Sequence, residues 1–237
     1  MKKKYFCVIF LSLILLARIL TTEQSVKVMN HLFHRNSRPE AEAVTIAIDP
    51  GHGGWDPGKV GINNAKEKEI NLAIAFKLKS LLEQKNIKVI MTREADVGLY
   101  SEGESNKKRS DLNNRVRLIN SSGAVFAISI HQNSFTEEYV KGAQVFYYAR
   151  SAEGKDLAEL MQDKIKETLK DGNHRKAKAN ESYVLLTKTE LPLVIVECGY
   201  LSNQKEAALL VTEEYQDKMA EAISVGILEY LKKGSGN

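Results

Sequence analysis

The stretch VTIAIDPGHGG, residues 44–54, decides the fold class of this chain. Its first part, Val44–Ile48, is a short run rich in β-branched residues that breaks at Asp49-Pro50-Gly51, which is typical of a strand entering a loop. The run is apolar at nearly every position, so both faces of the strand are expected to be buried. Such a strand belongs to the inside of a sheet that is covered by helices.

The segments that follow alternate between strand and helix patterns. We expect further strands at 87–91, 125–130, 143–148, 183–186 and 193–196. Apolar residues at helical spacing predict helices at 66–84, 111–120, 152–169 and 212–231, and a polar surface loop is expected at about 93–110. This order predicts an α/β fold, a three-layer sandwich with a mostly parallel central sheet flanked by helices. Ligands of such folds bind beyond the carboxyl ends of the strands.

The chain begins like an exported protein. Lysines at positions 2–4 precede an apolar run over residues 5–20. The uninterrupted part is short for a spanning helix, which needs about 20 apolar residues, and no A-x-A cleavage site follows, so a cleaved signal and a retained anchor both fit. We expect a signal peptide or membrane anchor at 1–20, a linker at 21–43 and one catalytic domain at 44–237, in an extracytoplasmic, anchored or secreted protein.

The charge distribution argues against nucleic acid as a partner. The chain carries a net charge of +4, and the excess of basic over acidic residues lies within residues 1–43, so the expected domain is neutral overall. A neutral domain lacks the positive surface that binding to a phosphate backbone requires. Of the two cysteines, Cys7 lies in the apolar segment, so a disulfide with Cys198 is not expected.

Three of the expected strands end on residues that bind metals or transfer protons. His52 follows the first strand, His131 follows the strand at 125–130, and Glu197 follows the strand at 193–196. Zinc in hydrolases takes three protein ligands, often of the His2Glu type, and leaves a fourth position for water. One further acid is then needed to move protons. The pattern predicts a metal site at one edge of the sheet.

The loop after the first strand is rich in glycine, which invites a comparison with phosphate-binding loops. It contains neither G-x-x-x-x-G-K-[ST] nor a G-x-G-x-x-G that opens a helix directly, so nucleotide binding is not indicated. Glycines on either side of His52 instead let the backbone turn sharply and leave space for a bulky substrate.

Two acids at the start of the expected helix 66–84 are further candidate ligands. Glu67 lies three residues before Ile70 and seven before Ile74, which places it near the face that packs on the sheet. Glu69 is turned away from that face. Glu67 is therefore the better candidate, although an acid in the first turn of a helix also stabilises the helix dipole.

Together these residues resemble the zinc-dependent N-acetylmuramoyl-L-alanine amidases, the amidase-3 family. The resemblance runs from about residue 44 to residue 230, with the motifs in order: Asp49-Pro50-Gly51-His52-Gly53-Gly54, Glu67-Lys68-Glu69-Ile70-Asn71-Leu72, Ser129-Ile130-His131-Gln132-Asn133 and Glu197-Cys198-Gly199-Tyr200-Leu201-Ser202-Asn203. It implies a sandwich of the phosphorylase/hydrolase-like type, one Zn²⁺ and peptidoglycan as the substrate.

The resemblance also assigns roles to individual residues. It implies that His52, Glu67 and His131 bind the zinc ion and that Glu197 is the catalytic acid/base. Asn133 and Arg175 are further candidates for substrate binding. Arg175 would meet a carboxylate of the stem peptide, but a solvated basic turn explains it equally well, and we expect His174 at the surface. The chain departs from frequent family residues at Ser134, Cys198 and Tyr200, none of which is an implied ligand.

Within this family the chain resembles the germination-specific amidases of the spore cortex. The runs that carry this likeness are Met91-Thr92-Arg93-Glu94, Arg115-Val116-Arg117-Leu118-Ile119-Asn120 and Gly142-Ala143-Gln144. The resemblance implies action in the forespore intermembrane space, removal of stem peptides before a deacetylase allows muramic δ-lactam to form, and an activating extracytoplasmic partner protein. Two alternatives remain open: a zinc peptidase that cuts within the stem, and an anchored, non-catalytic peptidoglycan-binding protein.

Overall fold

The computed structural model describes Lys27 and residues 43–234. The chain divides into two units, residues 1–43 and 44–237, and the second is described below. The predicted signal or anchor at 1–20 and most of the predicted linker lie outside the described residues. None of the described helices is both long enough and apolar enough to cross a membrane.

Six strands form one mixed sheet in the order β2-β1-β3-β6-β4-β5. Four of the five strand pairs are parallel, and β4 runs antiparallel to β6. The mostly parallel sheet predicted from the apolar runs is therefore observed, with one reversal. The strands are β1 (Thr45–Pro50), β2 (Lys88–Met91), β3 (Ala127–Asn133), β4 (Gln144–Tyr148), β5 (Lys178–Asn180) and β6 (Leu193–Tyr200).

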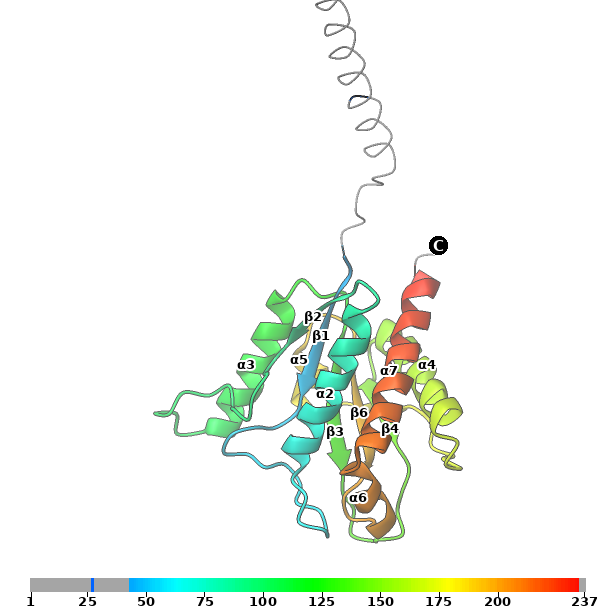
Figure 1. The fold of residues 1–237 in the computed structure, drawn as a ribbon. Helices are drawn as coiled ribbons and strands as arrows, with labels where there is room; N and C mark the ends of the chain where they lie inside the picture. Colours follow the sequence, from blue (N-terminus) through cyan, green and yellow to red (C-terminus); the bar gives the residue numbers. More distant parts are fainter. Residues whose placement is uncertain (1–26, 28–42, 235–237) are drawn as a thin grey trace, which may run out of the picture. The chain divides into compact units, whose positions relative to one another are not determined.

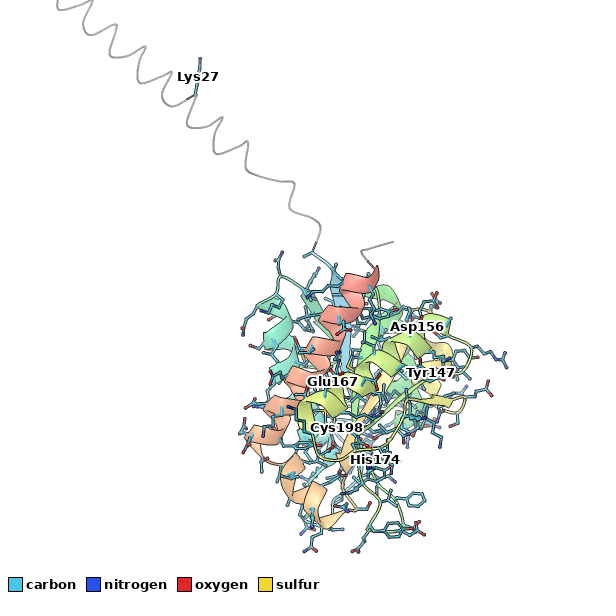
Figure 2. The ribbon with its side chains drawn as sticks, turned by 90° about the vertical axis from the view of Figure 1, so that its right-hand side faces the viewer. Lys27, Tyr147, Asp156, Glu167, His174 and Cys198 are labelled. Atoms are coloured by element: carbon cyan, nitrogen blue, oxygen red, sulfur yellow. The ribbon has the colours of Figure 1, made fainter. Side chains whose placement is uncertain are left out.

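Helices cover both faces of the sheet (Figure 1). On one face lie α2 (Glu67–Glu83), α4 (Ala152–Leu169) and α7 (Glu213–Gly234), and both views show α4 beside α7 (Figure 2). On the other face lie α3 (Lys107–Ser121) and the short α5 (Val184–Lys188). The helix α6 (Gln204–Leu210) follows β6 directly.

Alternate residues of each central strand pack into two separate cores. Ile46 and Ile48 of β1 contact the larger core beneath α2, α4 and α7, whereas Ala47 between them contacts the smaller core beneath α3 and α5. Because successive side chains of a strand point to opposite faces, an all-apolar strand supplies both cores at once. The first strand thus has the buried internal position that its sequence predicts.

One element was assigned to the wrong class from the sequence. The segment predicted as a strand at 183–186 is helical, since α5 spans Val184–Lys188. A run of four apolar residues does not distinguish a strand from a helical turn. The side chain of Asn180 accepts hydrogen bonds from the backbone N–H groups of Ser182 and Tyr183, which turns the chain out of β5 and into the helix. Leu185 and Leu186 then pack into the smaller core.

Four further differences concern the ends of elements and two short elements. The helix predicted at 111–120 begins earlier, at Lys107, because the side chain of Asn106 caps its first turn through the N–H of Arg109. The short strand β5 and the short helix α6 were not predicted, since neither has an apolar period of its own. The strand β6 runs on to Tyr200, past the apolar residues that predicted it.

Candidate metal centre and active site

The carboxyl ends of β1, β3 and β6 meet at one edge of the sheet. Figure 1 shows the arrows of β1 and β3 pointing to this edge, and the pairing of β3 with β6 places His131 opposite Glu197. The loop after β1 carries His52, and α2 begins close by with Glu67, whose carboxylate contacts both histidines. The four residues singled out in the sequence are therefore brought together, as strand ends in a parallel sheet predict.

His52 is held by a carboxylate on the side away from the cluster. Its Nδ1 lies 2.7 Å from Oδ2 of Asp56, and its Nε2 lies 3.2 Å from Oε1 of Glu67. Burial disfavours protonation of the ring, but hydrogen bonds to Asp56 and Glu67 outweigh it and raise the pKa of His52 to about 9. A carboxylate behind a histidine fixes the ring and its tautomer, which is the usual arrangement around a bound metal. Asp56 was not predicted from the sequence.

Glu67 accepts from both histidines and from the backbone. Its Oε1 lies 2.9 Å from Nδ1 of His131 and 3.0 Å from the N–H of Gln132, and its Oε2 accepts from the N–H of Lys59 at 2.7 Å. Burial acts to raise the pKa of Glu67, but the hydrogen bonds and charges of the two histidines hold it well below its usual range. The carboxylate is therefore charged and points into the cluster.

The prediction that Glu67 faces the sheet and Glu69 faces away from it is confirmed. Glu67 is 2% exposed, whereas the side chain of Glu69 is 58% exposed and pairs with Lys66 at the surface. Nitrogen or oxygen atoms of His52, Glu67 and His131 all lie within 4.8 Å of one another. Two imidazoles that converge on one buried carboxylate are a donor set that suits zinc.

The glycines of the loop leave space for the side chains of His131 and Glu67. A Cβ atom at Gly51 would lie 2.2 Å from Nε2 of His131, and one at Gly58 would lie 2.6 Å from Oε2 of Glu67. Gly58 also has a φ of +69°, which a side chain disfavours. Side chains at Gly51 and Gly58 would therefore collide with the cluster, and the space expected for a bulky substrate stays a prediction.

Glu197 lies beside the cluster but differs from Glu67 in its hydrogen bonding and in its pKa. It is 7% exposed, and its Oε2 has no hydrogen-bond partner among the described residues. Burial raises the pKa of Glu197 to about 7, with His131 opposing the shift and Glu67 adding to it. A carboxyl group whose pKa lies near neutrality can both accept and return a proton.

A cavity of about 610 Å³ contains all four residues. Asn133, one of the two predicted substrate-binding residues, lines it together with Lys59, Lys108 and Tyr183. Arg175, the other, lies in a second hollow between α6 and the loop after α4, where its guanidinium group stacks over Tyr200 and donates to the carbonyl of Lys141 at 2.7 Å. Its role in substrate binding stays a prediction. His174 is exposed, as expected (Figure 2).

Asp49, the acid nearest to His52 in the sequence, lies buried in β1 and forms a hydrogen-bond network next to the site. It is 1% exposed and binds Arg115 at 2.7 Å, Thr92 at 2.6 Å and Ser129 at 2.7 Å. Burial acts to raise the pKa of Asp49, but the charge of Arg115 and the two hydroxyl donors bring it down to about 2. The sequence did not reveal this network, because its members come from four separate segments.

The α/β fold and this site define a class of protein: a hydrolase with a cluster that can hold one metal ion beside a buried carboxyl group. The chain belongs to the family of N-acetylmuramoyl-L-alanine amidases, whose model matches residues 46–229. Its activity is therefore hydrolysis of the amide between N-acetylmuramic acid and L-alanine in peptidoglycan. This match confirms the resemblance carried by the four motifs of the sequence.

Individual relatives agree with the family. The chain is 43% identical over 188 residues to the germination-specific N-acetylmuramoyl-L-alanine amidase of Bacillus subtilis, which covers 78% of each chain. It superimposes with a TM-score of 0.77 and 41% identity on the CwlD amidase of Clostridioides difficile, solved in complex with the GerS lipoprotein, over 80% of this chain and 98% of that one. The catalytic domain of CwlV from Bacillus (Paenibacillus) polymyxa gives a TM-score of 0.70 at 32% identity, with 80% and 98% covered.

Proposed function

We propose that the chain is a zinc-dependent amidase of the spore cortex in which His52, Glu67 and His131 bind the metal and Glu197 transfers the proton. The observation that carries the proposal is the convergence of the three metal-binding side chains beside a buried carboxyl group that has a free oxygen. The three residues fit zinc because they supply two imidazole nitrogens and one carboxylate oxygen at short mutual distances. Zinc at such a site supplies a Lewis acid that polarises a carbonyl and acidifies water.

The chain's own residues perform the proton transfers. Glu197 accepts a proton from water as the water oxygen bonds to the carbonyl carbon of the lactyl group. It then passes that proton to the nitrogen of L-alanine as the C–N bond breaks, which leaves a carboxylic acid on muramic acid and a free amino terminus on the stem peptide. A pKa of about 7 suits both steps at neutral pH, and a nearby cation lowers the pKa and favours the basic form. Asp56 holds His52 in one orientation throughout.

The experiment that tests the activity and the metal together uses the full chain and cortex peptidoglycan. The chain is freed of metal, incubated with and without added Zn²⁺, and the released fragments are identified by mass spectrometry. We expect zinc-dependent release of intact stem peptides with free L-alanine amino termini. Cuts inside the stem would indicate a peptidase instead. Equal release of stem peptides with and without a chelator and with and without added zinc would contradict the metal role.

Zinc binding should strengthen as the pH rises. Because the pKa of His52 is raised to about 9 in the metal-free site, the ring is protonated at neutral pH and zinc must displace that proton. The apparent affinity is expected to rise by about tenfold per unit between about pH 6 and 8 for each proton displaced. Calorimetric titrations in buffers of different ionisation enthalpy measure the proton release. An affinity that is constant over this range would contradict the assignment of His52.

The setting in the spore is proposed from the relatives. The B. subtilis relative is named germination-specific, and the C. difficile relative is an amidase solved with a lipoprotein partner. We infer that this chain acts outside the cytoplasm on the cortex, that a deacetylase acts on its product, and that an extracytoplasmic partner activates it. Spores of a strain without this chain are expected to contain cortex that lacks muramic δ-lactam. Normal lactam content in such spores would contradict the cortex role.

A further inference from the structure

Three successive backbone carbonyls, at the end of β1 and in the loop that follows it, accept hydrogen bonds from two buried arginines. The carbonyl of Pro50 accepts from Nε of Arg93 and from Nη1 of Arg115, each at 2.9 Å. The carbonyl of Gly51 accepts from Nη2 of Arg93 at 3.0 Å, and that of His52 accepts from Nη2 of Arg115 at 2.6 Å. Arg93 is 3% exposed and Arg115 is 2% exposed. The backbone that carries His52 is therefore fixed from the interior of the protein.

This loop needs support because its conformation is unfavourable in isolation. His52 has a φ of +62°, in the left-handed region that a residue with a side chain rarely adopts. Its inward-pointing carbonyls also require donors, since a buried polar group without a partner is costly. Gly51 lies directly against the ring of His131, so a shift of the loop would displace two members of the cluster at once.

Arg93 connects this loop to the third member of the cluster. Its Nη2 donates to the carbonyl of Gly51 and also, at 2.8 Å, to the carbonyl of Lys68. Gly51 precedes His52 and Lys68 follows Glu67, so one nitrogen atom joins the backbone next to one ligand to the backbone next to another. The remaining bond of Arg93, from Nη1, goes to the carbonyl of Ala95 at 3.0 Å.

The choice of an arginine here is informative. Arg115 is neutralised by Asp49 and Asp111, whereas within the described part of the chain every hydrogen bond of Arg93 goes to a backbone carbonyl. Burial and the charge of Arg115 lower the pKa of Arg93 to about 10, which still leaves the group charged at neutral pH. Asp49, Asp96 and Asp111 oppose this shift through their charges, but no ion pair joins Arg93 to a carboxylate among the described residues. A buried cation that is not paired directly with an acid contributes little to stability by itself. A planar fork of donors is well suited to holding several acceptors at fixed positions.

We propose that Arg93 is a positioning residue for the metal site, which sets the separation of His52 and Glu67 through the carbonyls of Gly51 and Lys68. The inference rests on the proposed zinc function of this cluster. Lysine at position 93 retains the charge but has a single nitrogen, which cannot serve the carbonyls of Pro50, Gly51 and Lys68 in the same geometry. The positioning by Arg93 therefore depends on the shape of its side chain as well as on its charge.

The test compares the full-length chain with Arg93→Lys and with Arg117→Lys as a matched control. Arg117 lies on α3 at the surface and makes no contact with the cluster. Zinc affinity is measured by competition with a chromophoric chelator, the geometry of the site by the visible spectrum of the Co²⁺-substituted protein, and folding by thermal unfolding of the metal-free chain. We expect R93K to fold, to bind zinc about 10- to 100-fold more weakly and to show an altered Co²⁺ spectrum, while R117K matches the unaltered chain.

Each alternative outcome has a definite meaning. Unaltered zinc affinity and an unaltered Co²⁺ spectrum in folded R93K would overturn the positioning role while leaving the zinc proposal intact. An unaltered chain that binds no zinc would overturn both. If R93K does not fold, Arg93→Gln is measured in the same way. Loss of the fold in both variants, with and without saturating zinc, would assign Arg93 to folding of the domain and would also overturn the proposal.

Discussion

Glu197→Gln is expected to bind zinc as the unaltered chain does and to lose turnover by about 10²- to 10⁴-fold, the usual contribution of a positioned acid/base. Glutamine has nearly the same shape as glutamate but cannot take up a proton. The variant should also fold well, because burial raises the pKa of Glu197 to about 7 and a neutral side chain suits this environment. The loss should therefore appear in kcat, with a smaller change in KM.

The measurement is the rate of stem-peptide release by the full chain at saturating zinc, together with the zinc affinity of each variant. Glu159→Gln is the matched control: Glu159 lies on α4, is 56% exposed and, among the described residues, forms one ion pair, with Lys155 at 3.8 Å. We expect that control to retain full activity. Turnover within a factor of about three of the unaltered rate in E197Q would remove Glu197 from the proton-transfer role.

The part of the site that could be predicted from the sequence is the part that depends on local periodicity. Strands that are apolar throughout must be internal, and their ends must share an edge, which brings His52, His131 and Glu197 together. The helical period separates Glu67 from Glu69 by their burial, and the structure confirms the difference. These inferences need only the neighbours of each residue along the chain.

The parts that were missed depend on contacts between distant segments. Arg93 lies in a polar stretch expected as a surface loop, and nothing in its neighbours shows that it is 3% exposed and faces the carbonyls of another loop. The antiparallel pairing of β4 with β6 could not be predicted either, since the sequence of an apolar strand does not show in which direction the strand runs in the sheet. The helix at Val184–Lys188 was misread for lack of length. Tertiary packing decides each of these features.

Glu67→Gln is expected to weaken zinc binding by more than about 100-fold. Loss of a residue that only hydrogen-bonds a metal ligand costs roughly 10- to 100-fold, and Glu67 is proposed to bind the metal itself. Activity should fall with the zinc affinity. The carboxylate is shared by His52 and His131, and glutamine removes the negative charge on which both rings converge. The amide also introduces an N–H₂ group where the backbone donates to both oxygens, from Lys59 and from Gln132. One of these two backbone N–H groups would then face the NH₂ group of glutamine and lose its acceptor, which costs about 1–3 kcal/mol of stability.

Glu69→Gln is the control that makes this result decisive. The two glutamates lie in the same first turn of α2, and both lose one negative charge near the helix N-terminus, so effects on the helix dipole are matched. Only Glu67 contacts the histidines, because Glu69 points to the surface and pairs with Lys66 at 3.3 Å. Zinc affinity and release of stem peptides should therefore collapse in E67Q and persist in E69Q. Equal losses in both variants would mean that the acids act through the helix rather than through the metal.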